Sequence, residues 1–402
     1  MKILFLSQRF LFPMDTGGKI RTGKILEQLS RAHELTVVGN FEPANDAPYL
    51  SAMQAVCSRY IPVPWREPRR GQARFYARLA RNCLSRYPVT ALNDYSRTLE
   101  QAVLDALDSD DYDLAICDFV QSALVFRQVS VLPRLLFQHN VEARIFERHV
   151  NNARNWMARE FWRLQHGRMR KFEAAMVRDF DSVIAVSEAD ADVFRTEYGA
   201  TNVHAIPTGV DLEFYVPANV AVPSSNEIVF CGSMDWLPND DGVRFFLDTI
   251  TPHLDRTVPD WRFTVIGRNP PEWLRRRAAG NERISLTGWV DDVRPFLARA
   301  ALCVVPLRIG GGTRMKIYEA MAMGKAVVST TVGAEGLEYT DGNDICIADE
   351  AEEFASAIAG LLHDHERRKD MERAARMLVE ESFGWATVAR RFSAICEQAV
   401  GQ

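Results

Sequence analysis

The stretch GGGTRMKIYEAMAMGKAVVST, which runs from residue 310 to residue 330, is the strongest indicator of the fold. The three glycines at its start predict a tight loop whose bare backbone N–H groups come close to a ligand. Thr313 can cap the helix that follows, and Gly324 ends that helix. Ala326–Ser329 then predicts a buried strand. A loop, a short helix and a strand in this order are typical of an α/β sheet.

The same stretch carries the charges of a phosphate site. Arg314 lies in the first turn of the predicted helix, and Lys316 adds a second positive charge. A helix N-terminus beside an arginine binds phosphate oxygens. Glu319 lies three residues beyond Lys316 on the same side of the helix, where its carboxylate suits the hydroxyls of a sugar. The pattern indicates a nucleotide-sugar site, and a solvated Lys316–Glu319 ion pair is the alternative interpretation.

Two common nucleotide motifs are missing from this loop. No Gly-Lys-Ser/Thr follows the glycines at Walker spacing, and the stretch is not a G-x-G-x-x-G fingerprint. A nucleotide triphosphatase and a dehydrogenase are therefore disfavoured.

Length and composition predict a soluble protein of two domains. The 402 residues are 47% hydrophobic and 25% charged, and such a length exceeds one ordinary core. The net charge of −5 gives no general affinity for nucleic acid. Seven scattered cysteines without C-x-x-C spacing predict reduced thiols, with neither disulfides nor a zinc site. The N-terminal MKILFLSQRF predicts a first strand and not a signal peptide, so we expect a cytoplasmic protein.

Short apolar strands alternate with helical segments along the chain, which is the pattern of parallel sheets with crossover helices. In the first half the predicted strands are 3–7, 35–39, 114–118, 134–138 and 182–187, with helices at 19–31 and 99–107. In the second half the predicted strands are 227–231, 262–267, 284–287, 301–306 and 326–329. Ligands bind outside the carboxyl ends of such strands. The expected architecture is two Rossmann-like doubly wound α/β domains that face each other across a ligand-binding cleft.

A segment rich in proline, glycine and serine separates the two halves. It predicts an N-terminal domain at residues 1–207, a hinge at 208–225 and a second domain at 226–375. The end of the chain is strongly helical, and we expect residues 376–402 to return and brace the first domain.

Four features together resemble a known family. They are the two-domain pattern, the pair Gly17-Gly18 after the first strand, the hinge sequence 207–211 and the stretch 310–324. The combination is similar to the GT-B retaining glycosyltransferases, in particular glycosyltransferase family 4, the "glycosyl transferases group 1" family. This resemblance implies a nucleotide-sugar donor of the UDP or GDP type, held mainly by the second domain, and a glycan or lipid-linked acceptor, held mainly by the first. It also implies no bound metal and no cofactor.

The resemblance assigns roles to single residues of the second half. Arg314 and Lys316 are implied to hold the donor diphosphate and to stabilise the negative charge that grows on the departing phosphate. Glu319 is implied to accept hydrogen bonds from the ribose hydroxyls, and the backbone at Trp289 and Val290 to meet the nucleobase. The other implied donor-binding positions are Ser233, Gly311, Gly312 and Thr313 in this half, and Gly17 and Gly18 in the first half.

In the first half, the resemblance points to a histidine, and a carboxylate follows it closely in the sequence. His139 ends a predicted strand and matches the family's active-site histidine, which contacts the donor hexose. A structural histidine is the alternative interpretation. Glu142, three residues later, is a candidate to orient His139 or an acceptor hydroxyl, and a solvated carboxylate at a helix start is the alternative.

The chain departs from the family pattern at two places. The family often has two glutamates with seven residues between them, and the earlier position here is Gly311, so only Glu319 remains. The family also often has an Arg and a Lys after the first strand of the second domain, where this chain has GSMDWLPND at 232–240. We therefore expect Arg314 and Lys316 to take over diphosphate binding.

These features predict a retaining, metal-independent glycosyltransferase that moves a hexose from a nucleotide-sugar to an acceptor hydroxyl. The resemblance implies a front-face reaction, in which the donor phosphate helps to deprotonate the incoming hydroxyl. A sugar-nucleotide 2-epimerase and a non-catalytic nucleotide-sugar-binding scaffold are the alternatives.

Two other features have competing interpretations. Asp108-Ser109-Asp110 is a D-x-D string of the type that binds manganese in a different glycosyltransferase fold, but its acidic loop predicts a solvated turn. Two basic stretches with aromatic residues, at 66–84 and 144–171, predict contact with an anionic membrane surface, and ordinary surface helices are the alternative. We accordingly expect a protein that is peripheral at the inner face of the cell membrane.

Overall fold

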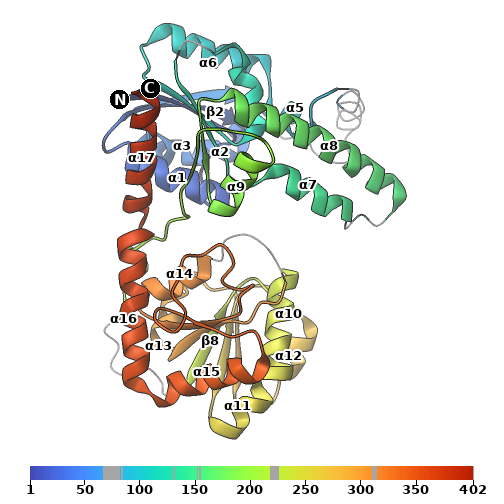
Figure 1. Cartoon of the computed structure of the whole chain (residues 1–402), viewed down its shortest axis with the longest axis vertical. Helices are drawn as coiled ribbons and strands as arrows, with labels where there is room; N and C mark the ends of the chain where they lie inside the picture. The colour runs from blue at the N-terminus through green and yellow to red at the C-terminus, as the bar shows by residue number, and fades with distance from the viewer. Residues whose placement is uncertain are drawn as a thin grey trace. The chain divides into compact units, whose positions relative to one another are not determined.

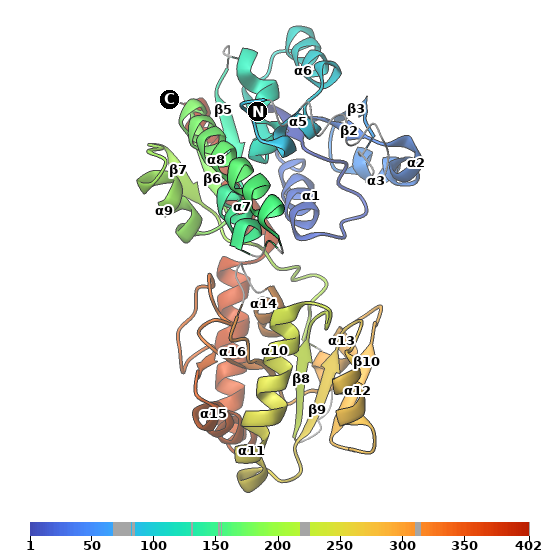
Figure 2. The ribbon, with the colours of Figure 1, turned by 90° about the vertical axis from the view of Figure 1, so that its right-hand side faces the viewer.

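The computed structural model describes residues 1–66, 82, 85–129, 132–151, 153, 155–217, 226–309 and 315–401. These residues form two compact units (Figures 1 and 2). Unit 1 comprises Met1–Pro207 and Val388–Gln402, and unit 2 comprises Thr208–Thr387. Each unit has a parallel sheet and a hydrophobic core of its own. The expected α/β fold with two Rossmann-like sheets is confirmed.

Unit 1 is built on a sheet of seven described strands in the order β3-β2-β1-β4-β5-β6-β7, and all neighbouring pairs are parallel. The strands are β1 Lys2–Ser7, β2 Glu34–Phe41, β3 Arg59–Pro64, β4 Leu114–Asp118, β5 Arg134–Phe137, β6 Ser182–Ala185 and β7 Val203–Ala205. In β1 and β4 almost every side chain is buried, as in a sheet covered on both faces. The chain order reverses between β1 and β4, so a ligand crevice is expected at the carboxyl ends of these strands.

Helices surround this sheet. They are α1 Gly17–Leu29, α2 Pro43–Asp46, α3 Leu50–Ala55, α5 Val89–Asp94, α6 Arg97–Ser109, α7 Glu142–Asn151, α8 Trp156–Asp179, α9 Glu188–Thr196 and α17 Trp385–Val400, with the 3₁₀ helices η1 Ala47–Tyr49 and η2 Val120–Gln128. The helix predicted at 99–107 is longer at both ends. It begins earlier because the Ser96 hydroxyl caps it, accepting a hydrogen bond from the Leu99 N–H at 3.1 Å.

Unit 2 is built on six described strands in the order β10-β9-β8-β11-β12-β13, again with parallel neighbours. The strands are β8 Glu227–Cys231, β9 Arg262–Ile266, β10 Ile284–Gly288, β11 Leu302–Val305, β12 Ala326–Ser329 and β13 Cys346–Ile347. The helices are α10 Leu237–Phe245, α11 Thr251–Thr257, α12 Glu272–Ala278, α13 Arg294–Arg299, α14 Met315–Ala322, α15 Ala351–His363 and α16 His365–Ser382, with the π-helix η3 Phe246–Ile250. Here the chain order reverses between β8 and β11. Among the helices that the structure describes, none is both long and apolar enough to cross a bilayer.

In the final helical region, the boundary between the two units lies later in the chain than the expected residue 376. The helix α16 contributes three side chains to the core of unit 2, namely Met371, Ala375 and Val379. Only from Val388 does the chain belong to unit 1, where α17 packs the Phe392 ring edge-to-face against Phe137 with centroids 5.2 Å apart. The boundary lies later because unit 2 already covers the apolar face of α16.

Candidate functional site

In unit 2 the candidate site lies at the carboxyl ends of β8 and β11, where the strand order reverses. The loop after β8 begins with Gly232, and its carbonyl oxygen lies only 1.9 Å from the position that a Cβ would take at Gly267. A glycine is therefore required at position 267 for the loops after β8 and β9 to touch. The contact brings two polar side chains together, since the Arg268 Nε donates to the Ser233 hydroxyl at 2.9 Å.

Arg268 is a cation that the sequence analysis missed. Its side chain is 66% exposed, and its Nε lies 3.8 Å from a carboxylate oxygen of Asp235. The Ser233 hydroxyl donates to the same carboxylate at 2.5 Å. Hydrogen bonds from Ser233 and Asn269 hold the pKa of Asp235 below its usual range. An arginine directly after a predicted strand was the available signal.

Lys316 reaches the loop after β8 from the first turn of α14. Its Nζ donates to Asn239 Oδ1 at 2.9 Å and lies 4.3 Å from the centroid of the Phe230 ring. Asn239 is buried, and its Nδ2 donates to the backbone oxygen of Ser233 at 2.8 Å. A Cβ at Gly232 would be only 2.8 Å from the Lys316 Nζ, so the ammonium group rests directly on this loop. Asn239, which the sequence analysis also missed, thus fixes Lys316 beside the segment where the family's cations are absent.

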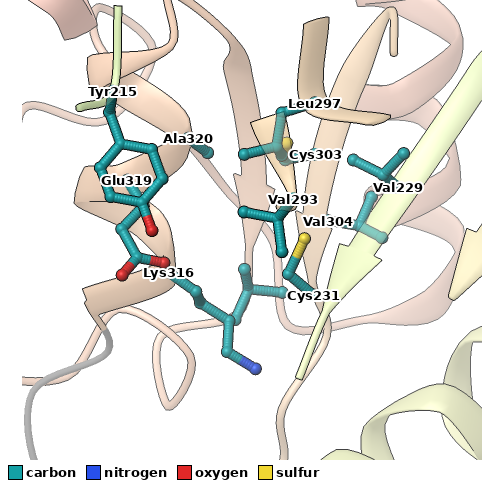
Figure 3. Close-up of a pocket in the computed structure, with 11 residues that line it drawn as sticks. Tyr215, Val229, Cys231, Val293, Leu297, Cys303, Val304, Lys316, Glu319 and Ala320 are labelled. Atoms are coloured by element: carbon teal, nitrogen blue, oxygen red, sulfur yellow. The ribbon is translucent and has the colours of Figure 1, made fainter. Parts of the chain in front are cut away.

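Glu319 follows on α14 and borders a cavity of about 90 Å³ (Figure 3). The walls are mainly aliphatic and cysteine side chains of β8, β11 and α13, and the Tyr215 hydroxyl points toward the Glu319 carboxylate and hydrogen-bonds to it. Burial raises the pKa of Glu319, while this hydrogen bond and the charge of Lys316 oppose the rise. Typical ligand sites enclose roughly 300–1,000 Å³, so this cavity suits one edge of a ligand. A carboxylate in such surroundings forms strong hydrogen bonds with hydroxyl groups.

Trp289 lies directly after β10 at the same edge of the sheet. Gly288 before it has a φ of 67°, in the left-handed region that strains other residues. The Trp289 side chain is 62% exposed, whereas Val290 packs against the core of unit 2. An exposed indole at this edge offers a flat surface on which a planar base can stack.

The glycine loop itself lies outside the described residues, and with it the predicted donor-binding residues Gly311, Gly312, Thr313 and Arg314. The described part of the stretch agrees with the prediction. The helix α14 covers Met315–Ala322, Gly324 has a φ of 65° after it, and β12 follows. Lys316 and Glu319 are therefore the two predicted site residues of this stretch that the structure brings together.

In unit 1, His139 lies just beyond β5 and is buried. Its Nε2 lies 2.8 Å from Asp118 Oδ1, and its Nδ1 lies 3.1 Å from the Arg21 Nη1. Since a guanidinium only donates, Nδ1 accepts from Arg21, and the ring proton sits on Nε2 and is donated to Asp118. Burial lowers the pKa of His139, which keeps the ring neutral. The Thr22 hydroxyl lies 3.2 Å from each oxygen of Asp118 and donates to this carboxylate.

Asp118, at the end of β4, is therefore the carboxylate that orients His139. From the sequence, Glu142 was the candidate to orient His139 or an acceptor hydroxyl, and Asp118 was predicted only as the end of a buried strand. Within the described residues, the Glu142 side chain instead hydrogen-bonds to Gln121 and Asn140.

The two glycines at the start of α1 have different surroundings. A Cβ at Gly18 would lie 2.8 Å from Cζ of Phe119, whereas nothing described lies within 4 Å of a Cβ at Gly17. Phe119 has a φ of 62°, which is unusual for a bulky residue, and its ring stacks on His139 with centroids 3.9 Å apart. Gly18 thus makes room for the stack on His139, and Gly17 leaves its backbone open to solvent.

Glu142 and Glu173 form a buried carboxylate pair behind this site. Glu173 accepts hydrogen bonds from the backbone N–H groups of Glu142 at 2.7 Å and Ala143 at 3.0 Å, and so caps α7. Gln138 Nε2 and the Tyr198 hydroxyl also donate to Glu173, each at 3.1 Å. Burial raises the pKa of both glutamates to about 7. The network ties the segment that carries His139 to α8.

The D-x-D string lies at the opposite edge of the sheet. Asp110 accepts a hydrogen bond from the Lys2 Nζ at 2.8 Å, next to the amino ends of β1 and β4. Across the part of the chain that the structure describes, no three His, Cys, Asp or Glu side chains form a group that could hold a metal. Of the basic stretch 66–84, only Arg66 and Asn82 are among the described residues.

Solved structures resemble the whole chain. HepE from Anabaena in complex with UDP has a TM-score of 0.66 at 15% identity, and the match covers 99% of this chain and 100% of HepE. Sucrose-phosphate synthase from Thermosynechococcus elongatus has a TM-score of 0.65 at 18% identity, with 100% of this chain and 99% of that protein covered. At these identities the likeness shows the fold, which is GT-B.

Two curated relatives differ in how much they match. An uncharacterized 44.6 kDa protein in the cps region of Klebsiella pneumoniae is 20% identical over 95% of this chain and 96% of its own length. The D-inositol 3-phosphate glycosyltransferase of Paenarthrobacter aurescens is 27% identical over 55% of this chain and 58% of its own length. The chain thus spans little more than half of the latter enzyme.

Family models match both halves of the chain. The model "Glycosyltransferase Family 4" matches residues 17–214, and the model "Glycosyl transferases group 1" matches residues 225–364. The two matched regions contain the carboxyl-edge residues of both sheets, including His139 in unit 1 and Lys316 and Glu319 in unit 2. The chain therefore belongs to glycosyltransferase family 4, the glycosyl transferases group 1 enzymes of the GT-B fold.

Proposed function

We propose that this glycosyltransferase moves a hexose from a UDP- or GDP-type donor to a hydroxyl of a glycan or lipid-linked glycan, with retention of anomeric configuration and without a metal. The observation that carries the proposal is the arrangement of Lys316 and Glu319 on one helix at the switch point of unit 2. A cation lies on the loop after β8, and a carboxylate lies one turn away beside an apolar cavity. This spacing suits a diphosphate followed by a ribose.

Proteins that are similar to this chain support the donor class. Structures of HepE include complexes with UDP and with UDP-glucose. One curated relative is a GDP-mannose-dependent phosphatidylinositol dimannoside mannosyltransferase of Mycobacterium tuberculosis, 26% identical over 54% of this chain and 57% of its own length. Donors of both bases and a lipid-linked acceptor thus occur among similar proteins.

In the proposed reaction, unit 2 holds the leaving group. We expect Lys316 and Arg314 to bind the diphosphate and to stabilise the negative charge that develops on it. Arg268 adds a third cation beside Ser233, and Asp235 holds its side chain in place before the donor binds. Glu319 accepts from the ribose hydroxyls while Tyr215 keeps its carboxylate oriented. The indole of Trp289 stacks on the base.

In unit 1, His139 takes part through its Nδ1 atom. The Nε2–H group donates to Asp118, so the lone pair on Nδ1 is free of a proton and can accept a hydrogen bond from a hydroxyl of the donor hexose. Arg21 occupies that lone pair in the structure. We expect the sugar hydroxyl to replace Arg21 there. Glu142, whose pKa of about 7 keeps part of it protonated at neutral pH, is the candidate partner for the acceptor hydroxyl.

The chemical step follows the front-face scheme that the family resemblance implies. The bond between the anomeric carbon and the phosphate oxygen breaks, and the acceptor oxygen bonds to the same face of that carbon. The acceptor's proton passes to the departing phosphate oxygen, so that no enzymic base is consumed. The transition state of this step has oxocarbenium character, as in glycoside hydrolysis.

A lipid-linked acceptor places the enzyme at the inner face of the cell membrane as a cytoplasmic, peripheral protein. The basic stretch 144–171, which covers most of α7 and α8, is the described part of the chain that supports this location.

The test is a thermal-shift screen against UDP- and GDP-sugars, followed by product analysis. Binding to the native state raises the apparent melting temperature, and we expect one donor to stand out. Incubation with that donor and an acceptor should give a glycoside of unchanged anomeric configuration in NMR spectra. Conversion of the donor alone into a second nucleotide-sugar would favour an epimerase, and binding without turnover with any acceptor would favour a scaffold.

A further inference from the structure

The helices α7 and α8 form a hairpin of unit 1, and its far end extends beyond the sheet (Figure 1). The base is fixed by Glu173 of α8, which caps the first turn of α7. Between the helices, the Trp162 ring stacks on His149 with centroids 4.4 Å apart and meets Phe146 edge-to-face at 5.8 Å. The hairpin therefore projects from the sheet, and the aromatic rings between its two helices pack against each other.

The far end of this hairpin, at the start of α8, exposes two large apolar side chains. Trp156 is 74% exposed and Met157 is 62% exposed. No other large hydrophobic side chain that the structure describes is as exposed as Trp156. Leu164, 47% exposed, lies seven residues after Met157 and so on the same side of α8. A cluster of this kind at the end of a projection indicates a contact surface.

The charge of the hairpin differs in sign from that of the chain. Residues 142–179 contain nine basic and five acidic residues, a net charge of +4, whereas the whole chain has a net charge of −5. Two of the five acidic residues, Glu142 and Glu173, are buried at the base. The exposed charged groups near the tip are therefore mainly guanidinium groups, among them those of Arg148, Arg159 and Arg163.

We propose that the tip of the α7–α8 hairpin docks on an anionic membrane, with Trp156 and Met157 inserted at the level of the lipid headgroups. Tryptophan favours the boundary between headgroups and acyl chains, and nearby arginines are attracted by anionic lipids. A stable protein partner would cover about 800 Å² of this chain, which the two apolar side chains of the tip do not provide even together with Leu164. The proposal rests on the proposed function in one respect, since a membrane contact serves an enzyme whose acceptor is lipid-linked.

The experiment uses the full-length protein and vesicles of phosphatidylglycerol and phosphatidylcholine in equal parts, with phosphatidylcholine vesicles for comparison. Co-sedimentation should detect the wild type only with the anionic vesicles, and the bound fraction should fall as salt is added. Met157→Glu should weaken binding about tenfold or more, since it replaces an inserted apolar group by an anion. Met377→Glu is the matched control, because Met377 is 57% exposed on α16 in unit 2.

A second matched pair tests the basic groups. Arg163 pairs with Glu160 on α8, and Arg276 pairs with Glu272 on α12 at 3.0 Å. Arg163→Gln should reduce binding to anionic vesicles, and Arg276→Gln should not. Fluorescence of Trp156, compared with a Trp156→Phe variant, should shift to shorter wavelength when vesicles are added.

The proposal is overturned if the wild type does not bind anionic vesicles, or if Met157→Glu and Met377→Glu behave alike. Concentration-dependent self-association that Met157→Glu abolishes, without vesicle binding, would assign the tip to a second copy of this chain instead. Nucleotide binding by calorimetry, measured without vesicles on the same variants, separates the two proposals. Intact nucleotide binding with no docking rejects only the docking surface, and docking without nucleotide binding rejects only the proposed function.

Discussion

The carboxyl edges of the two sheets are built from similar parts but present them differently. In unit 2 the polar groups are partly open to solvent: Arg268 is 66% exposed, Trp289 is 62% exposed, and the half-buried Lys316 lies against Gly232 in the loop after β8. In unit 1 the corresponding groups are paired with each other, as in the chain from the half-buried Arg21 through His139 to Asp118, both of which are buried. The open edge has free surface for a ligand, whereas the buried edge holds its groups in fixed positions.

This contrast assigns different consequences to substitutions at the two edges. At the edge of unit 2, we expect changes in catalysis and binding with little change in stability. At the edge of unit 1, we expect changes in stability that accompany any change in activity, because each group there is a structural partner of the next.

The largest effect is expected for Lys316→Ala. Loss of one charge-stabilising group at a departing phosphate lowers turnover by roughly a hundredfold or more. Steady-state kinetics with the donor found by the thermal-shift screen should show the loss mainly in kcat, with a melting temperature close to that of the wild type. Lys369→Ala is the control, since Lys369 is 50% exposed on α16. Turnover within a few-fold of the wild type would remove Lys316 from the proposed site.

The glycine pair of α1 tests the buried edge. Gly18→Ala places a methyl group 2.8 Å from the Phe119 ring, which must then move off His139. We expect a loss of about 1–3 kcal/mol in the free energy of unfolding of unit 1, as for other overpacked sites. Gly17→Ala has open space for its methyl group and should leave this free energy unchanged or slightly raised. Urea unfolding of both variants measures the difference, and equal stabilities would contradict the described stack.

A smaller effect is expected from the buried carboxylates. The folded-state pKa of Glu142 is about 7, against 4.5 for an exposed glutamate, so between these values the folded chain binds more protons than the unfolded chain. The free energy of unfolding should therefore decrease as the pH rises through this range. Glu142→Gln should flatten that decrease by about 1–2 kcal/mol, whereas Glu147→Gln on the exposed side of α7 should not. A pH dependence identical to the wild type would show that Glu142 is solvated.

Parts of both units could be predicted from the sequence. The position of α14, its end at Gly324 and the alternation of strands and helices followed from local patterns, because glycine conformation and hydrophobic periodicity act over a few residues. Glu319 and Lys316 could be named for the same reason, from their spacing on one helix.

The partners of those residues could not be predicted in the same way. Asn239 meets Lys316 from 77 residues away, and Asp118 meets His139 from 21 residues away on a different strand. Such pairs depend on strand order, and no local pattern encodes it. Arg268 was missed for a related reason: it lies beside Ser233 only because Gly267 lets two loops touch.

The most direct test of the proposed donor site is calorimetric titration of the wild type and of Glu319→Gln with free UDP and free GDP. We predict that the wild type binds one of the two nucleotides and that Glu319→Gln weakens this binding by about tenfold, since a hydrogen bond to a charged group contributes roughly 1.5–3 kcal/mol. The melting temperatures of the two proteins should agree. Equal affinities would contradict a ribose contact at Glu319 and, with it, the assignment of the open edge of unit 2 as the donor site.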